Sequence, residues 1–286
     1  MRSYAGGVVM IDGLACEEAG EGPALVLIHA GIADRRMWRH QREVLSARHR
    51  VISYDWRGYG ESADPVGEVV HHRDLLRVMD GLGVERAVLV GDSMGGSHAV
   101  EAALVAPGRV AGLVLIASGL SGHVWPEEML AQARERVHGT VPADRLARYR
   151  DGTAEKVLAE DVEAFARAHV LWQVAGPDRG VDDLDPRVWE LALAMMRRVF
   201  ERSWSGPPVP ERHLQAKERL GEVGCPALVI NGLADVPGIQ AVSGLLAEGI
   251  RGAGRLDLPG TGHLPPLERP AEVNAALTGF LAGVGW

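Results

Sequence analysis

The sequence is poor in cysteine, in clustered basic residues and in long apolar runs, and each shortage excludes a class of protein. Cys16 and Cys225 lie far apart without C-x-x-C spacing, which argues against a redox pair or a cysteine-based metal site. The net charge is −8 and the arginines are scattered, so no segment favours binding to nucleic acid or to an anionic membrane. No apolar run could span a bilayer, and the first residues lack the apolar core of a signal peptide. We therefore expect a cytoplasmic protein.

What the chain does have is enough apolar residues for a large core, because 47% of its 286 residues are hydrophobic. Short, continuous apolar runs alternate with segments whose apolar residues recur at helical spacing. The apolar runs cover residues 25–29, 51–55, 87–91, 110–117 and 227–230, and a last strand is expected at 255–259. The helical patterns cover 37–47, 72–82, 94–105 and 271–281. Strands buried on both faces read as such runs, so the alternation predicts an α/β fold with a mostly parallel central sheet between two layers of helices.

The alternation stops in the middle of the chain. Residues 121–218 contain no buried-strand pattern, but helical patterns appear at 127–138, 154–172 and 186–204. Strand and helix alternation then resumes at Ala227. We therefore expect residues 1–120 and 219–286 to form one core, interrupted by a helical insertion at 121–218.

A candidate nucleophile stands where one apolar run meets a helical pattern. Residues 91–95 read Gly-Asp-Ser-Met-Gly, a G-x-S-x-G sequence between the run at 87–91 and the helix predicted from Met94. A turn this sharp strains its central residue, so small neighbours such as Gly91 and Gly95 are needed. The Ser93 hydroxyl would then stand exposed above the sheet.

A serine hydroxyl needs a histidine to accept its proton and a carboxylate to orient that histidine. Among eleven histidines, His263 fits best, because it lies in a loop rich in glycine and proline between the last strand and the closing helix. Asp235 follows the preceding strand and lies at the same sheet edge. Asp257 is closer to His263 in sequence but sits within a strand, so Asp235 is the better candidate. The order Ser, Asp, His is typical of this arrangement.

Charge that develops on a substrate oxygen requires backbone donors near Ser93. The N–H of Met94 begins the helix after the nucleophile, and we expect a second donor, the N–H of Ile32, in the turn that follows the first apolar run. Ala30 stands in that turn where many similar turns have glycine. Nothing in these motifs calls for a metal or a cofactor.

Five segments together resemble the α/β-hydrolase fold superfamily: residues 27–31, 55–62, 91–96, 232–235 and 262–263. The resemblance extends from about Gly22 to the carboxyl end. Residues 29–38 and 262–270 are further similar to bacterial hydrolases near the 3-oxoadipate enol-lactonases. The resemblance implies that the helical insertion is a cap over the active site, where Trp125 and Trp172 are candidates for the substrate pocket.

These motifs predict a serine hydrolase that cleaves a small ester or lactone through an acyl-enzyme on Ser93. A second interpretation keeps the same three residues but makes the protein an acyltransferase or thioesterase acting on an acyl thioester, with an acyl-carrier protein as a possible partner. A third is a ligand receptor that retains the pocket without catalysis. Motif spacing does not report whether water reaches the acyl group, so the first two interpretations remain open.

Overall fold

The computed structural model describes residues 7–286. The fold is built on an eight-stranded sheet with the strand order β1-β2-β4-β3-β5-β6-β7-β8. The strands are β1 (Val9–Ile11), β2 (Leu14–Ala19), β3 (Ala24–Ile28), β4 (Arg50–Tyr54), β5 (Ala87–Asp92), β6 (Val110–Ile116), β7 (Ala227–Gly232) and β8 (Gly254–Leu258). The β1–β2 and β2–β4 pairs are antiparallel, and the other strand pairs are parallel. The predicted α/β fold with a mostly parallel sheet is confirmed.

Helices cover both faces of the sheet because successive side chains of a strand point to opposite sides. Leu25 and Leu27 of β3 belong to one apolar cluster, and Val26 and Ile28 belong to the other. The first cluster is closed by α1 (Arg39–Leu45) and α10 (Pro270–Gly283), and the second by α2 (His71–Gly81), α3 (Met94–Val105) and α8 (Pro237–Gly249). The short helix α9 (Pro265–Glu268) precedes α10. Parallel strands buried in this way need continuous apolar sequence, which the central strands β3, β5 and β6 have. The edge strand β8 reads Gly-Arg-Leu-Asp-Leu and is mostly exposed.

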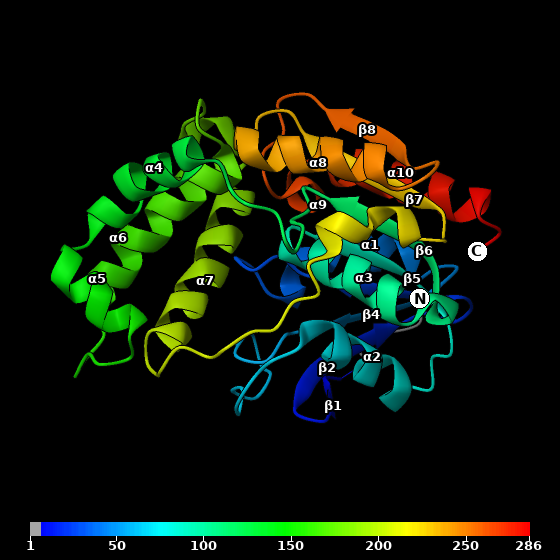
Figure 1. Cartoon of the computed structure of the whole chain (residues 1–286), viewed down its shortest axis with the longest axis horizontal. Helices are drawn as coiled ribbons and strands as arrows, with labels where there is room; N and C mark the ends of the chain where they lie inside the picture. Colours follow the sequence, from blue (N-terminus) through cyan, green and yellow to red (C-terminus); the bar gives the residue numbers. More distant parts are fainter. Residues whose placement is uncertain (1–6) are drawn as a thin grey trace.

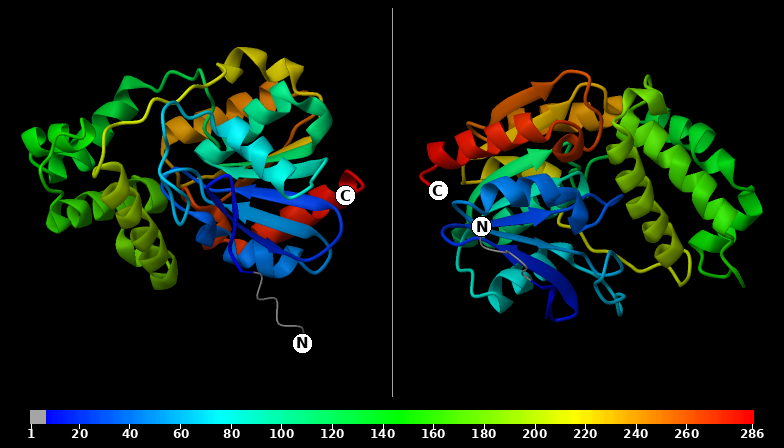
Figure 2. Two further views of the ribbon diagram at one scale, coloured as in Figure 1. Left: turned by 90° about the horizontal axis from the view of Figure 1, so that it is seen from below. Right: turned by 180° about the vertical axis from the view of Figure 1, so that it is seen from behind.

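Four longer helices lie between β6 and β7 in the chain: α4 (Glu127–Arg136), α5 (Ala143–Arg150), α6 (Ala159–His169) and α7 (Pro186–Ser203). They form a group to one side of the sheet, at the left of Figure 1, and the same group stands apart in both views of Figure 2. A third apolar cluster holds this group together, with Tyr149, Phe165 and Trp204 among its members. The boundaries 121 and 218 of a separate cap remain a prediction.

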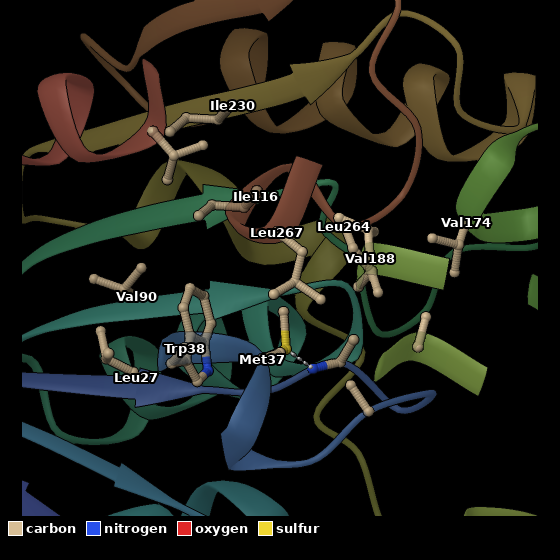
Figure 3. Close-up of a cluster of buried hydrophobic side chains, with 14 of the residues drawn as sticks. Leu27, Met37, Trp38, Val90, Ile116, Val174, Val188, Ile230, Leu264 and Leu267 are labelled. Carbon is tan, nitrogen blue, oxygen red and sulfur yellow. Dashed lines mark hydrogen bonds between the residues drawn. The ribbon is translucent and has the colours of Figure 1, made fainter. Parts of the chain in front are cut away.

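Two parts of this group pack against the sheet, α7 and the turn that follows α6. Val174 and Val188 join the cluster of Leu27, Val90 and Ile116, as Figure 3 shows. Val174 lies in η4 (Val170–Ala175), a π-helical turn that continues α6. The helix predicted over 154–172 is therefore shorter at its start and changes its winding at its end.

The β1–β2 hairpin, α5 and α8 were not predicted. The hairpin of β1 and β2 has little apolar alternation, because half of β2 reads Glu-Glu-Ala and is only partly buried. Helix α5 falls between the helical patterns at 127–138 and 154–172, and α8 was not named although Ile239, Val242 and Leu246 recur at helical spacing. The prediction that the chain has no signal peptide concerns its first residues, and residues 1–6 lie outside the described range. Within residues 7–286, no helix is long and apolar enough to cross a membrane.

Candidate active site

Ser93 occupies the sharp turn between β5 and α3. Its backbone has φ 53° and ψ −124°, a conformation that a residue with a side chain rarely adopts. The turn is possible because its neighbours are glycines: a Cβ on Gly91 would overlap the carbonyl of Gly95, and a Cβ on Gly95 would overlap the carbonyl of Ile28. Backbone bonds to the neighbouring strand β6 and the loop after it hold the strained residue: the Ser93 N–H donates to the Ile116 carbonyl (2.9 Å), and the Gly119 N–H donates to the Ser93 carbonyl (2.8 Å).

The structure brings Ser93, His263 and Asp235 into one hydrogen-bonded row. The His263 Nε2 atom lies 2.9 Å from the Ser93 Oγ atom, and the His263 Nδ1 atom lies 2.6 Å from an Asp235 carboxylate oxygen. An ionised carboxylate accepts hydrogen bonds, so Nδ1 carries the proton and Nε2 is free to accept from the serine hydroxyl. Sequence analysis named all three residues.

The row is almost sealed from solvent. His263 is 0% exposed, Asp235 is 1% exposed and Ser93 is 6% exposed, so Ser93 is buried, whereas its hydroxyl was expected from the sequence to be exposed. The other Asp235 oxygen accepts a hydrogen bond from the N–H of Val236 at 2.6 Å. The loop of Asp235 is tied to that of His263, because the Ala234 N–H donates to the Thr261 carbonyl at 2.8 Å. Burial in a low-dielectric environment strengthens these hydrogen bonds and holds the imidazole in one orientation.

The two expected backbone donors lie in turns that contact each other. A Cβ placed on Gly31 would lie 3.8 Å from the Met94 side chain, and the Gly95 turn abuts the end of β3. Outside regular helices and strands, neither the N–H of Ile32 nor that of Met94 donates a backbone hydrogen bond within residues 7–286. The turn itself is closed by the Ala33 N–H and the Ala30 carbonyl at 3.0 Å. Donation by both N–H groups to an oxygen bound beside Ser93 remains a prediction.

His29 is a structural residue of this turn. One ring nitrogen donates to the Ala30 carbonyl at 2.8 Å, and the other accepts from the Trp56 N–H at 3.1 Å. Complete burial lowers the pKa of His29, more strongly than the nearby carboxylate of Asp55 raises it. The ring is therefore neutral and fully bonded, and it has no free nitrogen for proton transfer.

Asp92 is a buried carboxyl beside the nucleophile in sequence. It is 0% exposed, and neither of its oxygens has a hydrogen-bond partner among the described residues. Burial, together with the negative charge of Asp235, raises the pKa of Asp92 well above its usual range.

The helical segment contributes one polar contact to the site that sequence analysis missed. The Gln173 side-chain nitrogen lies 3.1 Å from the Nε2 atom of His263. Gln173 belongs to η4, whose other residues are Val, Leu, Trp, Val and Ala. A single glutamine in an otherwise apolar run was the available signal, but its direction depends on the π-helical turn.

The predicted pocket residues lie close to this segment in the chain or in the fold. Trp172 precedes Gln173, is buried in the third apolar cluster and has no partner for its indole N–H among the described residues. Trp125 is partly buried and packs against both the second and third clusters. Their contact with a substrate remains a prediction. Within residues 7–286, no group of three or more histidine, cysteine or acidic side chains is arranged to hold a metal ion.

Comparison with known proteins identifies the family of this fold. A family model described as the alpha/beta hydrolase fold matches residues 23–270. A protein of Azorhizobium caulinodans, named as a candidate carbamate hydrolase (RutD), is 30% identical over 262 residues, which cover 89% of this chain and 90% of that protein. The 3-oxoadipate enol-lactonase 1 of Acinetobacter baylyi is 23% identical over 92% of this chain and 90% of its own. A thermophilic esterase of Thermogutta terrifontis superposes with a TM-score of 0.70 at 27% identity, and the match covers 95% of this chain and 93% of that one.

Proposed function

The chain belongs to the α/β-hydrolase fold family, and from this premise we propose that it hydrolyses an ester or lactone of a small organic molecule through an acyl-enzyme on Ser93. The observation that supports this proposal most strongly is the buried row of Ser93, His263 and Asp235. Its two hydrogen bonds have the geometry that proton transfer from a serine requires.

In the first half of the reaction, the Ser93 oxygen forms a bond to the substrate carbonyl carbon while its proton moves to the Nε2 atom of His263. Asp235 stabilises the resulting imidazolium through the proton on Nδ1. The carbonyl oxygen becomes negatively charged, and the N–H groups of Ile32 and Met94 donate to it. The bond from carbon to the leaving oxygen then breaks, and His263 gives its proton to that oxygen.

In the second half, water takes the place of the leaving group. His263 accepts a proton from the water, and the water oxygen attacks the acyl carbon. The bond to the Ser93 oxygen breaks and the serine recovers its proton, so the products are a carboxylic acid and the free enzyme. We assign the pocket around the acyl group to Trp172 and Trp125, since large aromatic side chains supply apolar contact.

The relatives support a carbonyl substrate with a heteroatom leaving group. Their names describe an esterase, an enol-lactonase and a candidate carbamate hydrolase. Esters, lactones and carbamates share a carbonyl carbon that a serine oxygen can attack. We therefore propose a small ester or lactone as the substrate class.

The test combines a covalent probe with a substrate panel. A fluorophosphonate should modify the wild-type protein on the peptide that contains Ser93 and leave Ser93→Ala unmodified. Among p-nitrophenyl esters, lactones and acyl thioesters, the wild type should turn over at least one ester or lactone, and Ser93→Ala should lose several powers of ten in kcat. A Ser93→Ala protein with full activity contradicts the proposal. A stable acyl-Ser93 adduct that only an acceptor alcohol or thiol releases would instead identify an acyltransferase.

A further inference from the structure

Gln173 contacts the nitrogen atom that accepts the serine proton in the proposed reaction. Its amide nitrogen lies 3.1 Å from His263 Nε2, the same atom that lies 2.9 Å from the Ser93 oxygen. A neutral imidazole with its proton on Nδ1 has a single lone pair, on Nε2. The hydroxyl of Ser93 and the amide of Gln173 are therefore two donors directed at one acceptor.

The segment that carries Gln173 is fixed to the loop of His263. The His263 N–H donates to the Val174 carbonyl at 3.3 Å, one residue beyond Gln173. Arg179 joins the end of the segment to the same loop, with hydrogen bonds to the Gly260 carbonyl (2.8 Å) and to Glu268 (2.9 Å). These contacts hold η4 against the histidine loop. A π-helical turn is rare and frequently occurs at a functional site.

The contact with the Gln173 amide favours one protonation state of His263. The N–H of Gln173 can donate to unprotonated Nε2, but it has no acceptor there once Nε2 carries a proton. The contact therefore stabilises the imidazole form of His263 relative to the imidazolium form. We infer that Gln173 is a positioning residue of the site, which keeps His263 as a proton acceptor in the free enzyme. This inference rests on the proposed function, since it assumes that His263 accepts the proton of Ser93.

Other groups also act on His263 and must be separated from Gln173. Asp235 and Ser93 bond to the ring directly, and His169 of α6 lies within electrostatic range of it. Burial lowers the pKa of His169 to about 4, against the smaller opposing effect of a hydrogen bond with Gln173, so His169 is uncharged at neutral pH. The remaining nearby groups act on Asp235 or on each other: Asp92, Glu268 and Arg179. When Gln173 alone is replaced, Asp92, Glu268 and Arg179 stay the same. His169 loses its bond with Gln173 in Gln173→Met but stays uncharged, because that bond only opposed the larger effect of burial.

Two replacements of Gln173 separate its hydrogen bond from its volume. Gln173→Met keeps a similar length without a donor, and Gln173→Glu keeps the shape but places an acceptor beside Nε2. The rate of Ser93 modification by a fluorophosphonate, measured against pH, reports the fraction of unprotonated His263 without the need for a known substrate. The fluoride leaving group needs no proton from the enzyme.

We expect the acid limb of this pH profile to move to higher pH by about half a unit to one unit in Gln173→Met, the effect of one neutral hydrogen bond. At pH values below the limb, labelling would slow by about three- to tenfold. Gln173→Glu should move the limb further, by more than about one unit, because a carboxylate favours the imidazolium. Gln132→Met is the matched control, since Gln132 is another glutamine of the helical group, on α4, and its side chain has no hydrogen bond to the site in the described structure.

The outcomes distinguish the inference from the proposed function. Wild-type protein that labels at Ser93, with the same acid limb in all three variants, overturns the role of Gln173 and leaves the acyl-enzyme proposal standing. Wild-type protein that does not label at Ser93 overturns the proposed function instead. Circular dichroism checks that both Gln173 variants fold, and the near-isosteric glutamate keeps the test decisive where methionine unfolds the segment.

Discussion

Asp92→Asn should make the protein more stable at neutral pH, and the gain should depend on pH. Asp92 is fully buried without a hydrogen-bond partner among residues 7–286, and burial raises its pKa well above the usual range. The unfolded chain releases this proton near pH 3.8, whereas the folded protein retains it to higher pH. Below about pH 3.8, Asp92 therefore has no effect on the free energy of unfolding. As the pH rises above this value, Asp92 lowers the free energy of unfolding. Asparagine has nearly the same shape and no charge, so it removes this loss.

The size of the effect follows from the same difference in pKa between the folded and unfolded states. The loss grows by at most about 1.4 kcal/mol for each pH unit above the unfolded value. At pH 7 the gain from Asp92→Asn can therefore reach about 4 kcal/mol, which sets its upper limit. Near pH 4 the two proteins should differ by little, because the carboxyl is then neutral in both states.

Urea denaturation at several pH values from 4.5 to 8 measures this difference directly. The free energy of unfolding of Asp92→Asn minus that of the wild type should increase with pH over this range. Asp178→Asn is the control, since Asp178 is exposed and its replacement should leave a difference that is flat with pH. A flat difference for Asp92→Asn as well would refute the reasoning, because it would mean that Asp92 is ionised in the folded protein.

Three further predictions concern the site and its support. Asp235→Asn should lower kcat by about 10⁴-fold with little change in fold, which steady-state kinetics on the best substrate of the panel would check, and a loss below tenfold would contradict the role of Asp235. Gly95→Ala places a Cβ against the Ile28 carbonyl and should destabilise the protein by about 1–3 kcal/mol in urea, and an unchanged midpoint would contradict the crowded turn. The His213 ring lies 3.6 Å from Glu101 and 3.4 Å from Glu211, and these two ion pairs raise its pKa to about 10. The stabilising effect of His213 is therefore complete below about pH 6.5 and disappears as the pH rises toward 10. His213→Gln should remove that part of the pH dependence of thermal unfolding, and an unaltered profile would show that the pairs contribute nothing.

Ser93 follows from local sequence because the geometry of its turn is local. A strand that turns this sharply into a helix needs small residues such as Gly91 and Gly95 beside its central residue, and that requirement marks Ser93 without any tertiary information. His263 and Asp235 are found because the carboxyl ends of parallel strands meet at one edge. The fold was predictable because strands buried on both faces are continuous apolar runs.

The parts that escaped prediction depend on contacts distant in the chain. The direction of Gln173 is set by a π-helical turn that forms where η4 packs on the sheet cluster through Val174. A helical pattern cannot report that change of winding. The β1–β2 hairpin escaped because Glu17 and Glu18 pair with arginines at its edge and give no apolar alternation.

The most direct test of the central claim is the location of the acyl group during turnover. The protein would be mixed with an excess of a p-nitrophenyl ester, quenched in acid within milliseconds to seconds, digested and analysed by mass spectrometry. We expect the mass of the acyl group on the peptide that contains Ser93, at an occupancy that rises and then falls as substrate is consumed. Acyl groups on another peptide, or complete turnover with Ser93 unmodified at every time point, would contradict the account.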